Sequence, residues 1–142
     1  MVGWLGFSSL LLFGIGCLHV YWALGGKWGM NVALPTAVSS KQRAFVPGKM
    51  ATLLVSVLLF GTSLLLLVQG AGLASTHPYP IVRWGCRICV LVFGLRVIGD
   101  FKYIGLFKKV RDSRFAKFDS YLFVPLCLWL CLSFYAALRM GG

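Results

Sequence analysis

Residues 81–99 form an apolar stretch that nevertheless contains three arginines and two cysteines, side chains that can bind an anion or exchange a disulfide. Arg83 and Arg87 are spaced i, i+4, so a helix places them on one face. A charge inside an apolar helix is costly and indicates a functional site. Planar guanidinium groups suit phosphate and carboxylate, so the pair is a candidate site for an anionic ligand. The alternative is that both side chains snorkel to lipid phosphates.

Arg96 and Asp100, also spaced i, i+4, can form a salt bridge at the other end of this stretch. We expect His19, near the end of the first apolar run, at a similar depth, and Tyr103 adds a hydrogen-bond donor. Two interpretations stay open for this cluster. It pins the third helix to the first, or it forms a polar site that binds a headgroup or relays a proton.

Cys86 and Cys89 form a CxxC pair near the start of the same stretch. A helix N-terminus and a nearby arginine favour the thiolate and thiol–disulfide exchange. A membrane thiol–disulfide oxidoreductase is therefore an alternative function, although Cys127 and Cys131 are expected in mid-span and offer no outward-facing second pair. Inert packing is the other interpretation. The spacing of cysteines and histidines predicts neither a metal site nor a cofactor.

These residues lie in or beside long apolar runs, at residues 4–24, 50–74, 81–99 and 120–138. Each run approaches or exceeds the ~20 residues that a helix needs to cross a bilayer. Of the 142 residues, 59% are hydrophobic and only 12% are charged. We predict an all-α polytopic membrane protein: a single domain, residues 1–142, with four transmembrane helices in an antiparallel bundle.

The basic residues are unevenly distributed, because ten of the 14 lysines and arginines lie in residues 25–49 and 100–119. With four spans these two segments share one side of the membrane, and Lys and Arg collect on the cytoplasmic side. We therefore expect both termini outside. The net charge of +11 attracts anionic lipid headgroups, and nucleic-acid binding is not expected.

The segment after the third run interleaves aromatic residues with lysines. We predict that the third helix extends to about residue 110 in the headgroup layer, with a turn at Asp112 and Ser113 before the fourth helix. A solvated basic loop is the alternative.

Three motifs resemble a family of small bacterial integral membrane proteins, catalogued as a domain of unknown function. They are HVYWALGGKWG at 19–29, RVIGDFKYIGLFK at 96–108, and Asp119 and Tyr121 before Pro125. The resemblance implies a four-helix protein of the bacterial cytoplasmic membrane and brings no established activity. It gives more weight to His19, Trp22, Arg96 and Asp100 than to the cysteines.

We predict that the protein binds or transports a small or lipid-like anionic substrate, and enzymatic activity stays open through the thiol–disulfide alternative. A non-catalytic accessory subunit of a membrane complex is a further alternative. The expected partners are anionic lipids and a second copy of the chain or another membrane protein. The candidate substrate-binding residues are His19, Trp22, Arg83, Arg87, Arg96, Asp100 and Tyr103.

Overall fold

The computed structural model describes residues 2–34, 47–70, 79–99, 105–109 and 114–140. Within these ranges the protein is helical and contains no strand. The long helices are α1 (Val2–Ala23), α3 (Lys49–Gly70), α4 (Pro80–Ile98) and α6 (Val124–Met140). The short elements are α2 (Met30–Ala33), α5 (Arg114–Phe118) and a π-helical turn, η1 (Asp119–Phe123), which leads directly into α6.

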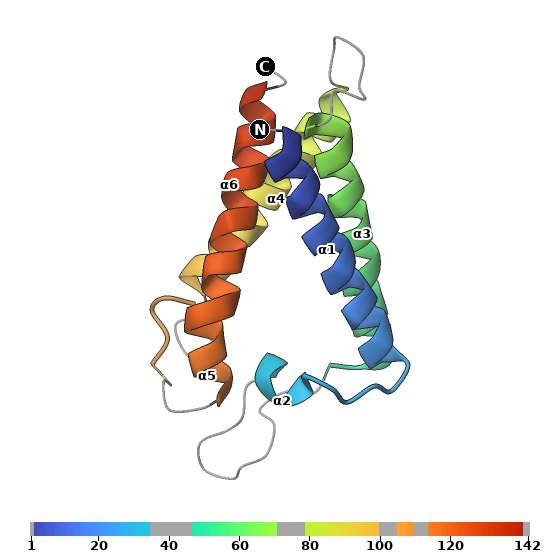
Figure 1. The fold of residues 1–142 in the computed structure, drawn as a ribbon, viewed down its shortest axis with the longest axis vertical. Helices are drawn as coiled ribbons and strands as arrows, with labels where there is room; N and C mark the ends of the chain where they lie inside the picture. The colour runs from blue at the N-terminus through green and yellow to red at the C-terminus, as the bar shows by residue number, and fades with distance from the viewer. Residues whose placement is uncertain (1, 35–46, 71–78, 100–104, 110–113, 141–142) are drawn as a thin grey trace.

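The long helices form two antiparallel pairs, α1 with α3 and α4 with α6 (Figure 1). The pairs meet near the chain termini, where α1 and α4 begin and α3 and α6 end; we call this the terminal end. They diverge toward the opposite end, which holds the start of α3 and the end of α4. We call it the basic end. There α2 lies between the diverging pairs and contacts α5.

Three helical segments are long and apolar enough to cross a membrane: Gly3–Ala23, Lys49–Gly70 and Arg114–Met140. The last segment comprises α5, η1 and α6. It begins at Arg114, whereas the apolar run in the sequence begins at residue 120. Helix α4 has 19 residues but carries three arginines, which lower its apolar content. The all-helical prediction is confirmed, and three of the four predicted spans meet the length and composition of a membrane-crossing helix.

The α1–α3 pair packs through small and hydroxyl-bearing residues. Ser9 and Ser63 bond to each other across the interface, with their hydroxyl oxygens 2.8 Å apart. Ser56 donates a 3.0 Å hydrogen bond to the carbonyl of Gly16. A Cβ atom at Gly16 would lie 2.7 Å from the ring of Phe60, so the ring occupies the space that glycine leaves. Close approach of this kind is typical of helix pairs in membranes, where small residues replace hydrophobic burial as the means of association.

The core of the bundle lies where α4 and α6 meet the other pair. Cys86 of α4 and Phe134 of α6 are fully buried there beside Leu66 of α3. The rings of Phe93 and Phe134 stack at 5.9 Å between centroids. A polar contact joins α1 to α6, since the hydroxyls of Ser8 and Ser133 lie 2.9 Å apart. These contacts fix the two pairs to each other at the terminal half of the molecule.

The end of α4 differs from the sequence-based expectation. The helix stops at Ile98, and residues 105–109 form turns rather than the predicted extension toward residue 110. Gly99 and Gly105 both have positive φ angles, 85° and 90°, which a right-handed helix cannot accommodate. The predicted turn at Asp112 and Ser113 lies outside the described residues.

Candidate functional site at the basic end

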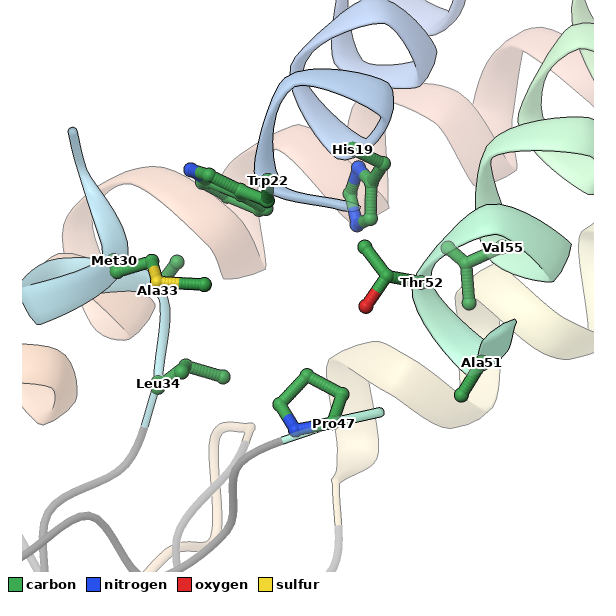
Figure 2. A pocket seen from close by; sticks show the side chains of 9 residues that line it. All are labelled: His19, Trp22, Met30, Ala33, Leu34, Pro47, Ala51, Thr52 and Val55. Carbon is green, nitrogen blue, oxygen red and sulfur yellow. The ribbon is translucent and has the colours of Figure 1, made fainter. Parts of the chain in front are cut away.

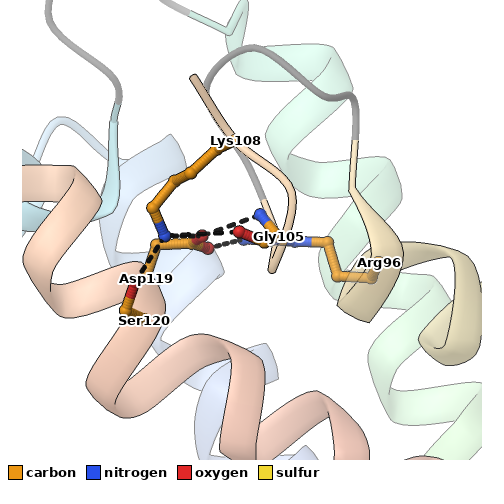
Figure 3. Close-up of polar contacts among 5 residues, drawn as sticks. All are labelled: Arg96, Gly105, Lys108, Asp119 and Ser120. Atoms are coloured by element: carbon orange, nitrogen blue, oxygen red, sulfur yellow. Dashed lines mark hydrogen bonds and ion pairs between the residues drawn. The ribbon is translucent and has the colours of Figure 1, made fainter. Parts of the chain in front are cut away.

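A buried carboxylate lies at the centre of the basic end. Asp119 is fully buried, with one carboxylate oxygen, Oδ2, 2.9 Å from the Lys108 ammonium. The other oxygen, Oδ1, lies 3.1 Å from Nη2 of Arg96, an ion pair whose geometry is not that of a hydrogen bond. The backbone N–H of Gly105 also donates to Oδ2, at 2.8 Å (Figure 3). One acid therefore joins three separate parts of the chain.

Local backbone geometry brings these parts together. The N–H of Leu106 donates to the carbonyl of Val97 at 3.0 Å, which holds the turn against the last residues of α4. A Cβ atom at Gly105 would collide with the Ile98 carbonyl, so this approach requires glycine. Asp119 opens the π-helical turn, an element that inserts an extra residue in a helix and is frequent at functional sites.

The ammonium of Lys108 is saturated by its neighbours. It donates to Asp119 at 2.9 Å, to the hydroxyl of Ser120 at 2.7 Å and to the carbonyl of Gly105 at 3.4 Å. An ammonium has three protons, so none is left for a ligand. We call Arg96, Gly105, Lys108, Asp119 and Ser120 the basic-end clamp. Its contacts hold separate segments of the chain together.

At the same end of the molecule as the clamp, a pocket of about 260 Å³ lies between α1, α2 and the start of α3 (Figure 2). His19 of α1 points toward Thr52 of α3, whereas the Trp22 ring lies on the α2 side of the pocket. Most of its wall is apolar, and its lining residues are His19, Trp22, Met30, Ala33, Leu34, Pro47, Ala51, Thr52 and Val55. An apolar cavity with few polar groups is the usual form of a small-molecule site.

Hydrogen bonding orients the imidazole of His19. Its Nδ1 lies 2.8 Å from the Ile15 carbonyl, which can only accept, so Nδ1 carries a proton. The other ring nitrogen, Nε2, points into the pocket near Thr52 (Figure 2). Trp22 packs edge-on to the imidazole at 5.1 Å and donates its indole N–H to the Trp28 carbonyl at 2.8 Å. Thus Nε2 is the polar group that the pocket offers a ligand most directly.

A second pocket, of about 180 Å³, lies at the terminal end and is lined by Pro80, Arg83, Trp84 and Arg87. The predicted pairing of the two arginines on one face is therefore present. The guanidinium of Arg87 lies 5.0 Å from the centroid of the Trp84 ring, a cation–π contact.

The predicted site residues fall into separate groups. His19 and Trp22 share the pocket of Figure 2, and Arg83 and Arg87 share the pocket at the terminal end. Arg96 pairs with Asp119. Asp100 and Tyr103 lie outside the described residues, so the predicted Arg96–Asp100 bridge stays a prediction.

Sequence reasoning did not select Lys108 or Asp119 for this site. Asp119 was noticed only within the family motif, and its position just before the last apolar run was the available signal, since a carboxylate there needs a partner.

The cysteines of the CxxC pair belong to the core. Cys86 and Cys89 are 0% and 6% exposed, and both thiols are free. This burial favours packing, and thiol exchange stays a hypothesis. Gln69 of α3 donates a hydrogen bond to the Ala137 carbonyl of α6 at 3.3 Å. Among the described residues, no three His, Cys, Asp or Glu side chains are grouped to hold a metal ion.

These features define an all-helical protein with three helices long and apolar enough to cross a membrane. At one end a cluster of ion pairs joins separate segments of the chain. The chain belongs to the family described as "Protein of unknown function (DUF3995)", whose model matches residues 12–134. The matched range contains the clamp and both pockets. No curated protein and no solved structure matches the chain.

Proposed function

We propose that the protein crosses the bacterial cytoplasmic membrane four times, with α4 as the fourth span and both termini outside. Nineteen residues at ~1.5 Å each give α4 a length of roughly 28 Å, close to the ~30 Å of a hydrocarbon core. Its packing along α6 and against α3 supports a position inside the bundle. The basic end then faces the cytoplasm, in accord with its described lysines and arginines: Lys27, Lys49, Arg96, Lys108, Lys109, Arg114 and Lys117.

Within this topology the protein binds a small or lipid-like anionic molecule in the pocket between α1, α2 and α3. The observation that carries the proposal is a largely apolar cavity into which one imidazole nitrogen points. At about 260 Å³ the cavity is slightly smaller than the ~300–1,000 Å³ of typical ligand sites. It therefore fits part of an acyl chain or a small amphiphile better than a large ligand.

The polar groups around the pocket favour an acidic ligand. A neutral imidazole accepts a hydrogen bond from a carboxylic acid or hydroxyl, and a protonated one donates to a carboxylate or phosphate. Lys49, an exposed residue, opens α3 two positions after the lining residue Pro47. Lys49 thus adds a positive charge to the chain segment that lines the pocket, which suits a molecule with one anionic head and one apolar tail.

The basic-end clamp supports this site indirectly. It fixes the turn after α4 to the helical segment that begins at Arg114, and α5 of that segment contacts α2. Since α2 provides part of the pocket wall, the clamp holds one side of the site in place. A binding site built on fixed elements loses less conformational entropy when the ligand enters.

Photo-crosslinking tests the proposal. The full chain in nanodiscs of zwitterionic lipid is incubated with a diazirine-labelled fatty acid, and crosslinked peptides are mapped by mass spectrometry. We expect labelling around the pocket of Figure 2, competed by unlabelled fatty acid but not by its methyl ester. Thr52→Trp fills the pocket and should reduce this labelling at least fivefold, about the factor that 1 kcal/mol gives.

Two control variants separate occupancy from folding. Leu54→Trp places the same side chain on an exposed position of α3 and should leave labelling unchanged. Thr52→Val keeps the side-chain volume and should also retain it. Equal labelling of the two tryptophan variants, or equal competition by the methyl ester, would contradict the proposal.

A further inference from the structure

We propose a second, separate site at the terminal end, in which Arg83 and Arg87 bind a phosphate-bearing anion. It uses no residue of the His19 pocket, so it does not depend on the function proposed above. The site is the pocket of about 180 Å³ that the two arginines line with Pro80 and Trp84. Its size suits a phosphate group better than a whole amphiphile.

The guanidinium groups are directed by their surroundings. Arg87 is held 5.0 Å over the Trp84 ring, which restricts its orientation while leaving the N–H groups at its edge free to bond. The Nε atom of Arg83 is buried and has no hydrogen-bond partner among the described residues. A buried donor without a partner costs free energy, and an anion in the adjacent pocket would supply the missing acceptor.

No carboxylate of this chain is placed to neutralise the two arginines within the described structure. The sequence contains three acids, Asp100, Asp112 and Asp119, and all of them follow the end of α4. Asp119 lies at the opposite end of the molecule, where Arg96 and Lys108 already bind it. The counter-ion of Arg83 and Arg87 therefore has to come from outside the described part of the chain.

The backbone contributes little to this site. The N–H groups of Val82 and Arg83 already donate to the Tyr79 carbonyl, at 3.0 and 3.3 Å, and Pro80 has no N–H. The two side chains then provide most of the hydrogen bonds, and guanidinium groups bind phosphate oxygens in pairs. This requirement for a planar fork separates the site from ordinary snorkelling, which an ammonium performs equally well.

Native mass spectrometry of the full chain in a neutral detergent tests the site. The probes are phosphatidylglycerol and, in a separate titration, inorganic phosphate. We expect the wild-type chain to bind one of these probes at least tenfold more tightly than Arg83→Gln or Arg87→Gln. Arg139→Gln is the matched control, because it removes an exposed arginine at the same end, outside the pocket, and should bind as the wild type does.

The conservative variants decide the mechanism. Arg83→Lys and Arg87→Lys keep the charge and should still lose most of the affinity. If phosphatidylglycerol shows the dependence on arginine, the source is a lipid headgroup; if inorganic phosphate shows it, the source is a free anion. The proposal is wrong if the lysine variants bind both probes as tightly as wild type. It is equally wrong if Arg139→Gln weakens binding as much as Arg87→Gln.

Discussion

The two ends of the bundle treat arginine in opposite ways. At the basic end Arg96 shares a fully buried carboxylate with Lys108, and that ammonium has further bonds to Ser120 and Gly105. At the terminal end Arg83 and Arg87 line an open pocket with no acid among the described residues near them. Charge in an apolar bundle therefore has two uses: a charge neutralised within the chain holds segments together, and a charge that the chain does not neutralise is available to a ligand.

The largest effect should follow the loss of Asp119. Asp119→Asn removes the carboxylate that lies 2.9 Å from the buried ammonium of Lys108, and breaking a buried pair in this way costs about 3–5 kcal/mol. We expect a strong fall in unfolding temperature in detergent, measured by tryptophan fluorescence. Adding Lys108→Met should restore part of the loss because it removes the ammonium that has lost this carboxylate. An Asp119→Asn chain as stable as wild type would show that the clamp is not a fastening.

Gly105→Ala should have the next largest effect. Its φ of 90° costs a residue with a Cβ about 1–2 kcal/mol, and the added atom also meets the Ile98 carbonyl. The clamp would be distorted without any change of charge, which separates its geometry from its electrostatics. Gly14→Ala is the control, since nothing lies within 4 Å of a Cβ atom there. Thermal unfolding of the two variants should differ; equal stability would mean that the turn adapts freely.

The sequence predicted what is local. The long helices follow from apolar runs, and the shared face of Arg83 and Arg87 follows from i, i+4 spacing within one helix. His19 and Trp22 are one turn apart in α1 and line one pocket for the same reason. Periodicity alone is enough to place such residues beside each other.

Contacts between distant segments could not be predicted in this way. Arg96 pairs with Asp119, which lies 23 positions later in the sequence. That pairing depends on the turn at Gly105 and on the π-helical turn that begins at Asp119. The alternation of aromatic residues and lysines predicts a helix after Ile98. The positive φ angles of Gly99 and Gly105 are not helical, and α4 ends at Ile98 instead.

Replacement of a single interhelical hydroxyl gives a smaller effect. Ser9 bonds to the hydroxyl and the carbonyl of Ser63, at 2.8 and 2.9 Å. Hydrogen bonds between membrane helices average ~0.6 kcal/mol each, so Ser9→Ala, which removes both, should lower stability by roughly 1 kcal/mol. A thermal shift as large as that of Asp119→Asn would mean that the α1–α3 interface, and not the clamp, dominates the stability of the bundle.

The smallest stability effect should come from Arg87→Gln. Within the described structure its interaction is the stacking on Trp84, worth about 0.5–1 kcal/mol, and no internal carboxylate is left unpaired. Arg96→Gln, the same change at the other end, removes one of the two cations on Asp119. It should cost about 1–2 kcal/mol, discounted for the part of Arg96 that solvent reaches. Unfolding midpoints measured in detergent without added phosphate or anionic lipid should therefore be highest for the wild type, lower for Arg87→Gln and lowest for Arg96→Gln. If Arg87→Gln is the less stable variant, the terminal-end arginine has a structural partner, and the contrast between neutralised and available charge no longer holds.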